Sequence, residues 1–226
     1  MLAPGDKLSL RPLAQRLGVS MQPVRHAVAQ LVAERALEVT PKRSVQVPLM
    51  SLPQFRELTT IRLGVEGFAA AHAAHQRGGT ERAAMRRHEA AFRRESKRRA
   101  PDPDAAILAN ANLHFAVYRA AGMPALVAII EGLWLRIGPV LNLDLRDGEN
   151  RLTSGIAARC HAHLLAAIEA GDTVSARNAL QQDISSTAAF IEARGVLPIA
   201  ISARRDGIRG LLLPSANASE AAVVAD

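Results

Sequence analysis

The segment from Ser9 to Leu31, SLRPLAQRLGVSMQPVRHAVAQL, constrains the possible fold of this chain more than any other. Ser9 stands at an N-cap position, and four apolar residues then recur at helical spacing: Leu10, Leu13, Ala14 and Leu17. Gly18 follows them, and glycine adopts the left-handed conformation of a helix C-terminus without a Cβ penalty. The pattern predicts a short helix that ends in a tight turn.

A second helix is expected directly after this turn. Ser20 stands where an N-cap belongs, and Pro23 lies in the first turn, where its missing N–H costs nothing. We expect one face to be buried (Val24, Ala27, Val28 and Leu31) and the other to face solvent (Met21, Gln22, Arg25 and His26). Two helices around a Gly-x-Ser turn, the second polar at its N-terminal end, indicate a helix-turn-helix.

Two short alternating segments follow, at residues 37–40 and 45–47, and a basic turn with Lys42 and Arg43 joins them. Such a pair of strands forms a wing, which can reach the groove next to the one that a recognition helix enters. Four spaced motifs then resemble the winged-helix domain of GntR-type transcriptional regulators: LAPGDKL (2–8), LAQRLGVS (13–20), PVR (23–25) and PKR (41–43).

The GntR resemblance implies a DNA-binding domain over residues 1–50. It implies that Arg11, Gln22 and Arg25 face the major groove and its phosphates, and that Lys42 and Arg43 serve the wing. Winged helices of this family normally open with a helix that packs behind the two described above. Because this chain begins at a stretch like the loop and strand after that helix, we expect the first helix to be missing. A misplaced start codon and a trimmed domain both account for this, and we favour the misplaced start.

The chain reads as almost entirely helical after Ser51, which forms a capping box with Gln54. Glycine and proline interrupt the helical pattern at 78–79, 101–103, 122–124, 147–148 and 171–172, which predicts about six helices. The expected fold is mainly α, a small winged helix-turn-helix followed by an antiparallel all-α bundle. We assign residues 51–195 to effector binding and dimerisation, and residues 196–226 to a loosely ordered tail. The near absence of a linker predicts that the wing abuts the bundle.

This second part resembles the helical ligand-binding FCD domain of the FadR branch of GntR regulators. The resemblance rests on Arg62-x-x-Val65-Glu66, Asn110-x-x-Leu113-His114, His161 and the run AIEAGD (167–172). It implies a small carboxylate effector in the bundle. Arg62 is a candidate for the effector's carboxylate, but it can equally pair with Glu66 one helical turn later.

The same family often holds a metal in the bundle, and the matching positions here are Asn110, His114, His161 and Asp183. Asn110 and His114 are four residues apart and so project from one face of a helix. The family usually has histidine where this chain has Asp183, which shifts the site toward harder metals while still permitting Zn²⁺, Ni²⁺ or Mn²⁺. The alternative is a buried cluster in which the four side chains bond one another. His163 is expected at the surface or behind the ligands.

Composition bounds the remaining possibilities. The chain has 226 residues and a net charge of +7, which suits a polyanionic partner. Its lone Cys160 cannot form an internal disulfide. We expect no apolar run to approach the roughly 20 residues of a membrane span, and no signal peptide is recognisable, so a cytoplasmic location is expected. The arginines between 86 and 99 are expected to form the solvated face of a helix that buries Met85 and Phe92.

Together these features predict a homodimeric, ligand-responsive transcriptional repressor that binds palindromic operator DNA and is not an enzyme. Two alternatives belong to other classes. A metal-dependent hydrolase could use the bundle's histidines and carboxylate to activate water, although no general base stands beside them. A non-specific nucleoid-type DNA-binding protein would fit the charge, and it would leave no bounded footprint on DNA.

Overall fold

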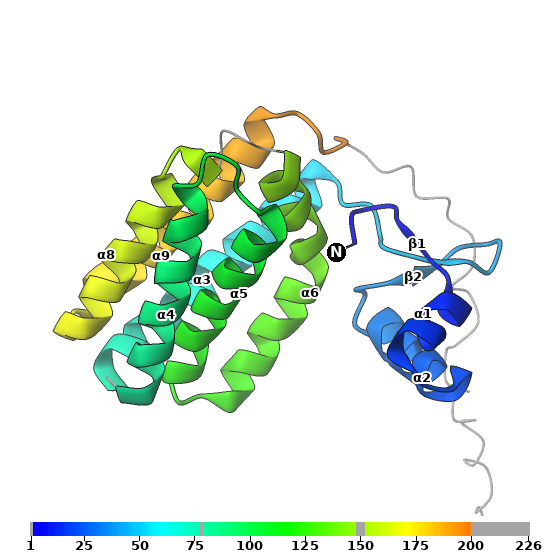
Figure 1. The fold of residues 1–226 in the computed structure, drawn as a ribbon, viewed down its shortest axis with the longest axis horizontal. Helices are drawn as coiled ribbons and strands as arrows, with labels where there is room; N and C mark the ends of the chain where they lie inside the picture. The colour runs from blue at the N-terminus through cyan, green and yellow to red at the C-terminus, as the bar shows by residue number, and fades with distance from the viewer. Residues whose placement is uncertain (1, 77–78, 148–151, 200–226) are drawn as a thin grey trace, which may run out of the picture.

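The structure is a computed structural model that describes residues 2–76, 79–147 and 152–199, with the side chains of residues 143, 144 and 147 excepted. Figure 1 shows two units, a small winged helix-turn-helix beside a larger helical bundle. The molecule is therefore mainly α, as the sequence predicts.

The winged helix consists of two helices and a three-stranded sheet. Its elements are β1 (Lys7–Leu8), α1 (Leu10–Leu17), α2 (Met21–Ala33), β2 (Glu38–Val39) and β3 (Val45–Gln46). The strand order is β1-β3-β2 and both pairings are antiparallel. Gly18 ends α1 with a φ of 65°, the left-handed conformation that the turn requires. The helix-turn-helix prediction is confirmed.

The predicted winged-helix core is wrong at Ala27 and Met21 of α2, and Leu17 of α1, although it is apolar and at helical spacing, does not belong to it. Leu17 is 61% exposed, because it lies in the last turn of α1 on a side that no described element covers. Ala27 is also exposed, whereas Met21, expected on the solvent face, is half-buried and packs on the core. Neither Ser9 nor Ser20 makes a side-chain cap hydrogen bond, although both occupy N-cap positions. The core itself is small and aliphatic: Ala14, Val24, Val28, Leu37 and Val47.

The wing turn is closed by hydrogen bonds between Thr40 and Ser44. The Thr40 N–H donates to the Ser44 carbonyl at 2.9 Å, and the two side-chain hydroxyl oxygens are 2.8 Å apart. Arg43 between them has a φ of 58°, a conformation in which glycine is the usual residue. Lys42 and Arg43 are exposed at the tip.

The bundle contains six long helices within the described ranges. They are α3 (Leu52–Gln76), α4 (Gly79–Ser96), α5 (Pro103–Ala120), α6 (Pro124–Asp147), α8 (Ile156–Ala170) and α9 (Thr173–Ala193). The capping box before α3 is present, because the Ser51 N–H donates to Gln54 Oε1 at 2.9 Å and the Gln54 N–H donates to Ser51 Oγ at 3.4 Å. Most helix boundaries lie at the predicted glycine and proline positions, although α4 already ends at Ser96 and α8 begins only at Ile156.

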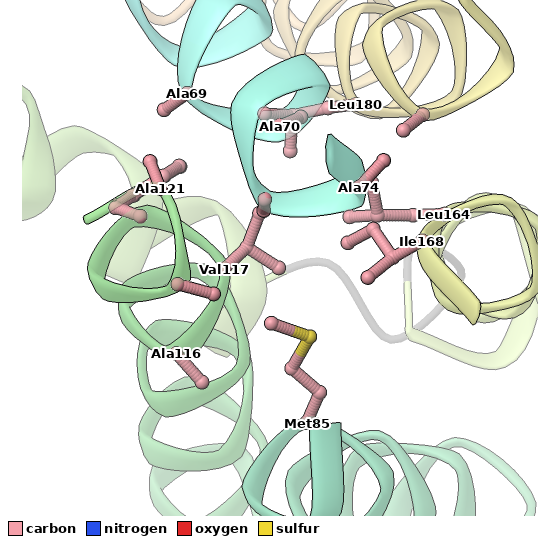
Figure 2. Close-up of a cluster of buried hydrophobic side chains, with 14 of the residues drawn as sticks. Ala69, Ala70, Ala74, Met85, Ala116, Val117, Ala121, Leu164, Ile168 and Leu180 are labelled. Carbon is pink, nitrogen blue, oxygen red and sulfur yellow. The ribbon is translucent and has the colours of Figure 1, made fainter. Parts of the chain in front are cut away.

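The main core of the bundle is built from small side chains. Figure 2 shows alanines of α3 facing Val117 of α5 and Leu164 and Ile168 of α8, while Met85 reaches in from α4. Gly67 on α3 lies against α9, and a Cβ atom there would be 3.0 Å from Gln181 Nε2. Small residues therefore set how closely α3 and α9 approach.

The expectation that no apolar run approaches the length of a membrane span is wrong for α6. Residues 124–142 are long and apolar enough to cross a membrane, with a mean hydropathy of 1.5. In the bundle one face of α6 is covered, with Ile130, Ile137 and Val140 in the cores. Only 28% of the stretch is buried, however, so Ile129 and Leu135 remain exposed on other sides. Packing within the bundle accounts for the covered face alone.

The two units meet loosely. Figure 1 shows α6 on the side of the bundle that faces the winged helix, and Leu37, Leu49, Leu58 and Arg136 line a cavity of about 470 Å³ at this junction. The close contact expected from the short linker is thus only partial. Residues 196–199 return to the start of α3, where the Leu52 N–H donates to the Pro198 carbonyl at 2.8 Å and Leu197 packs on the core. Most of the predicted tail lies outside the described residues.

Candidate effector and metal site

A carboxylate at the centre of the bundle, Glu66 of α3, collects four hydrogen-bond donors. Arg62, one turn earlier, donates through Nε at 2.5 Å to Oε1 and through Nη2 at 3.2 Å to Oε2. Trp134 Nε1 donates at 3.2 Å, and the Tyr118 hydroxyl donates to Oε2 in a very short bond. Glu66 is fully buried and Arg62 is 4% exposed. A buried arginine needs such a partner, so the pairing alternative for Arg62 is the one that the structure shows.

The charges of this group follow from its contacts. Burial lowers the pKa of Arg62, but the neighbouring Glu66 carboxylate outweighs it and the pKa lies above the ordinary value. Burial, with the Glu66 charge, raises the pKa of Tyr118 well above its ordinary value. The tyrosine is therefore neutral and keeps the proton that it donates to Glu66.

Tyr118 connects Glu66 to His114. His114 Nδ1 lies 2.9 Å from the Tyr118 oxygen. Because the tyrosine proton points to Glu66, this oxygen is left to accept a hydrogen bond from Nδ1–H. The tautomer of the imidazole is thereby fixed, and its Nε2 atom faces Asp183, with 3.2 Å between Nε2 and Oδ2.

Asp183 of α9 lies between two histidines. Its Oδ2 atom is 3.6 Å from Nε2 of His161 on α8, and the three side chains are all buried. One ligand atom from each of His114, His161 and Asp183 can be chosen so that all lie within 4.8 Å of one another. Burial raises the pKa of Asp183, but the two histidines outweigh it and hold the pKa well below the ordinary range.

These residues fit a divalent cation. With Nδ1 protonated, a neutral His114 turns a lone pair toward a carboxylate oxygen, and two acceptors at 3.2 Å require a proton or a cation between them. In addition, both ring nitrogens of His161 and the Oδ1 atom of Asp183 are buried without a hydrogen-bond partner among the described residues. Histidine, histidine and carboxylate form a donor set that Zn²⁺ and its neighbours accept. His114 also has the outer hydrogen bond that orients metal-binding histidines.

A small cavity of about 30 Å³ adjoins these groups, and Arg62, Asn110, His114 and Asp183 are in its lining. It has space for one or two water molecules. The structure therefore brings Asn110 and Arg62 to the same place as the other predicted ligands. His163 is exposed, as expected.

Sequence reasoning missed Tyr118 and Trp134. Tyr118 follows Asn110 and His114 at four-residue intervals, so a polar stripe along this helix was the available signal. Trp134 is the only tryptophan of the chain and lies on α6, but its spacing from the other residues carries no motif.

The predicted DNA-binding residues lie on the other unit. Arg11 on α1, Gln22 and Arg25 near the N-terminus of α2, and Lys42 and Arg43 on the wing are all exposed. The basic face of α4 is different, because Arg86 pairs with Glu169 at 2.5 Å and Arg98 with Glu95 at 3.0 Å. Met85 and Phe92 are buried beneath it, as predicted for a solvated helix face.

A winged helix with exposed basic residues, joined to a helical bundle with a buried polar site, defines a class: DNA-binding transcription regulators with a separate effector-binding domain. Two family models match the chain, "Bacterial regulatory proteins, gntR family" over residues 1–47 and "FCD domain" over residues 57–186. The protein belongs to the GntR family of transcription regulators. The hydrolase alternative is set aside, because this family and the relatives consist of regulators rather than enzymes.

The similar proteins support this assignment. The HTH-type transcriptional regulator McbR of Escherichia coli K12 is 30% identical over 190 residues, 84% of this chain and 85% of McbR. The structure of E. coli McbR/YncC has a TM-score of 0.78 at 29% identity and covers 86% of this chain and 90% of that one. The metal-free FCD domain of TM0439 shares the fold, with a TM-score of 0.53 at 21% identity, over 65% of this chain and 97% of that domain.

Proposed function

We propose that the protein is a homodimeric repressor of the FadR branch, located in the cytoplasm, which releases a palindromic operator when a small organic acid enters its helical bundle. The observation that carries this proposal is the buried polar site of Arg62, Glu66, His114, His161 and Asp183, which lies beside a cavity. Buried ionisable groups are costly in an apolar core, so a cluster of them beside a cavity is a candidate ligand site. The two predicted halves, residues 1–50 and 51–195, would divide DNA binding from sensing.

The DNA-binding part of the proposal follows from exposure and chemistry. Arg25 on α2 would read a base edge in the major groove, since arginine bonds a guanine bidentately, and Gln22 and Arg11 would hold bases and phosphates beside it. Lys42 and Arg43 would contact phosphates from the wing. All five side chains are exposed and none of these roles requires the fold to change.

The charges of the inner site determine what the effector meets. Arg62 and Glu66 neutralise one another, so Asp183 leaves the site with one negative charge when both histidines are neutral. A carboxylate would be repelled unless positive charge is added. The chemistry that a divalent cation would supply here is that charge, together with an open ligand position for the acid. His114, His161 and Asp183 would hold it, with Asn110 as a further oxygen donor.

Release of the operator would require the acid to bind one arrangement of the two winged helices better than the other. Dimerisation therefore belongs to the mechanism, because two half-sites are read at one fixed spacing. The outward apolar face of α6, with Ile129 and Leu135 exposed, supports a second copy of the chain as its cover. Ile129→Asp should convert the dimer to a monomer in sedimentation velocity, while Ala90→Asp, at an exposed position of α4, serves as the matched control.

A footprinting experiment tests the regulatory function. Purified protein is incubated with DNA from both sides of its own gene, and protection is compared with that of a scrambled duplex. A specific regulator protects a bounded, two-fold symmetric site, whereas a nucleoid-type protein protects all sequences alike. Uniform protection at every salt concentration would contradict the proposal.

Elemental analysis with melting curves tests the metal. If a metal is bound, wild type should carry close to one ion per chain, His114→Ala should lose it, and Asp183→His should bind a borderline metal more tightly. His163→Ala, an exposed histidine two residues from His161, is the control. A metal-free wild type whose melting ignores both chelator and added Zn²⁺, Ni²⁺ or Mn²⁺ would favour the hydrogen-bonded cluster instead.

A further inference from the structure

A second pocket lies between α5 and α6, directly outside the buried polar site. Its volume is about 230 Å³, and four of its lining residues also line the inner cavity: Asn110, Trp134, Leu141 and Leu145. The two spaces are therefore separated only by side chains that they share. One of these, Asn110, offers polar atoms at the boundary, whereas the N–H group of Trp134 is bonded to Glu66.

The outer pocket differs in chemistry from the inner cavity. Ile107, Leu108 and Ala111 of α5 form one wall, and Leu141 and Leu145 of α6 belong to the other. Leu108 is 57% exposed, an unusual position for a large apolar side chain in a helix that is otherwise well covered. An apolar pocket with polar groups at one end suits an amphipathic ligand.

The volumes of the inner cavity and the outer pocket indicate which end of such a ligand lies in which space. The inner cavity of about 30 Å³ has space for a carboxylate group or a water or two, but not for an organic acid. The outer pocket of about 230 Å³ is below the range of roughly 300–1,000 Å³ typical of drug-sized ligands. A small acid would therefore fill both spaces only by placing its charged group inside and its hydrocarbon part outside.

The part of α6 that lines the pocket is less firmly held by helical hydrogen bonds than the rest of the helix. Pro139 lies inside α6 and has no N–H to donate to the Leu135 carbonyl, and Gly138 precedes it in the lining of the pocket. Beyond this point an ion pair holds α6 to the start of α5, with Arg146 Nη2 2.6 Å from Asp104 Oδ1. Hydrogen bonding to Arg146 lowers the pKa of Asp104, so this pair persists at neutral pH.

We infer that the pocket between α5 and α6 receives the hydrocarbon part of the effector, a monocarboxylic acid with a short apolar chain, and that its walls select the chain length. This inference rests on the proposed function, because it places the acid's carboxylate at the inner site. Ala111, Leu108 and Leu141 are then the residues that determine specificity.

Trp134 provides the measurement, because it is the only tryptophan and borders both spaces. Full-length protein, with and without added Zn²⁺, is titrated with straight-chain acids from acetate to octanoate while tryptophan fluorescence is recorded. The dissociation constant should fall about fourfold for each added methylene until the pocket is full, since each buried CH₂ contributes about the same free energy.

Two variants of the outer pocket test the assignment. Ala111→Phe fills the pocket without reaching the inner cavity, so octanoate should bind at least about tenfold more weakly while acetate is unchanged. Leu108→Ala, at an exposed position that tolerates truncation, should weaken octanoate by a few-fold and spare acetate. Ala90→Phe, at an exposed position of α4 away from the pocket, is the control and should behave as wild type.

The outcomes separate this inference from the function on which it rests. If acids bind but both pocket variants keep the chain-length preference of wild type, the hydrocarbon part lies elsewhere, although acid sensing stands. If no acid changes the fluorescence with or without Zn²⁺, the inference is wrong. In parallel, the anisotropy of labelled operator DNA measures whether an acid releases the protein from DNA. If no acid does, the proposed acid-sensing function is wrong as well.

Discussion

The two units of this protein hold their functional side chains in opposite ways. In the winged helix, Arg25 and the wing residues project into solvent from a core of five aliphatic side chains, and within the described part of the chain no hydrogen-bond network orients them. In the bundle, Arg62, Glu66 and Tyr118 are buried and bonded to one another. A DNA groove orders the side chains that enter it, whereas a small ligand needs groups ordered in advance. Substitution of these side chains should therefore mainly lower the affinity for DNA in the winged helix, and mainly lower the free energy of unfolding in the bundle.

The N-termini of the helices also differ between the two units, because those of α5 and α9 in the bundle are capped by side-chain hydrogen bonds and those of α1 and α2 in the winged helix are not. Asp102 caps α5 by accepting from the N–H groups of Asp104 at 3.0 Å and Ala105 at 3.2 Å, and Asp172 caps α9 in the same way. In the winged helix, Ser9 and Ser20 occupy cap positions without such bonds. The bundle is thus reinforced locally, and the winged helix depends more on its small core.

The largest expected effect is that of Glu66→Gln. This change leaves the Arg62 charge buried without a counter-charge, which should reduce the free energy of unfolding of the bundle by about 3–5 kcal/mol. Chemical denaturation followed by Trp134 fluorescence measures the bundle, because the winged helix contains no tryptophan. Adding Arg62→Met to Glu66→Gln should recover part of the loss, since the unpaired charge of Arg62 is then removed.

The control for this change is an exposed pair of the same kind. Glu192→Gln removes the partner of Arg56 on the bundle surface, where the charges are 2.7 Å apart but solvated. Little change is expected there. Equal losses for Glu66→Gln and Glu192→Gln would contradict the contrast between a buried network and exposed groups.

Arg25→Ala should have the next largest effect, on DNA binding rather than stability. Losing a bidentate base contact should cost about 1–3 kcal/mol for the specific operator and reduce the ratio of specific to scrambled binding. Lys42→Ala should weaken both duplexes about equally and flatten the salt dependence by about one unit of slope. Titrations at several salt concentrations measure both.

An unchanged ratio for Arg25→Ala would show that α2 does not read the bases. Neither variant should alter the melting of the winged helix, because both side chains are exposed. A large loss of melting temperature would mean instead that these residues belong to the packing.

The smallest expected effect compares the caps. Asp102→Ala should destabilise the bundle by about 1 kcal/mol, since two N–H groups lose their acceptor. Ser20→Ala removes no cap hydrogen bond from α2 and should change the winged-helix transition much less. Calorimetry on both variants decides this, and a larger effect for Ser20→Ala would mean that its hydroxyl caps α2 in solution.

Local signals predicted much of this fold. Gly18, the Ser51–Gln54 capping box and the proline-rich helix starts are short-range features, so their positions could be read from neighbouring residues. Burial was harder, because it depends on what covers a residue from elsewhere. Leu17 and Ala27 have the right spacing but lack a cover, and Met21 packs although it stands on the polar side.

The candidate site shows the same division. Asn110 and His114 could be paired by their spacing on one helix, and family resemblance supplied His161 and Asp183. Nothing local could reveal that Tyr118 joins His114 to Glu66, because that contact spans 52 residues. Pairings of this length are decided by how α3, α5 and α6 pack, which the periodicity of single helices does not encode.

Gly67 gives this site a dependence on a position that never touches a ligand. Gly67 directly follows Glu66 in α3, and it allows α9 to lie so close that an added Cβ atom would be 3.0 Å from Gln181 Nε2. α3 supplies Arg62 and Glu66, and α9 supplies Asp183. The close approach of the two helices at Gly67 therefore helps to determine the distance between the carboxylates of Glu66 and Asp183. In an evolving family, Gly67→Ala would therefore be a substitution that adjusts the response to the effector. It would change the effector response by changing a spacing, with every ligand-contacting residue left as it was.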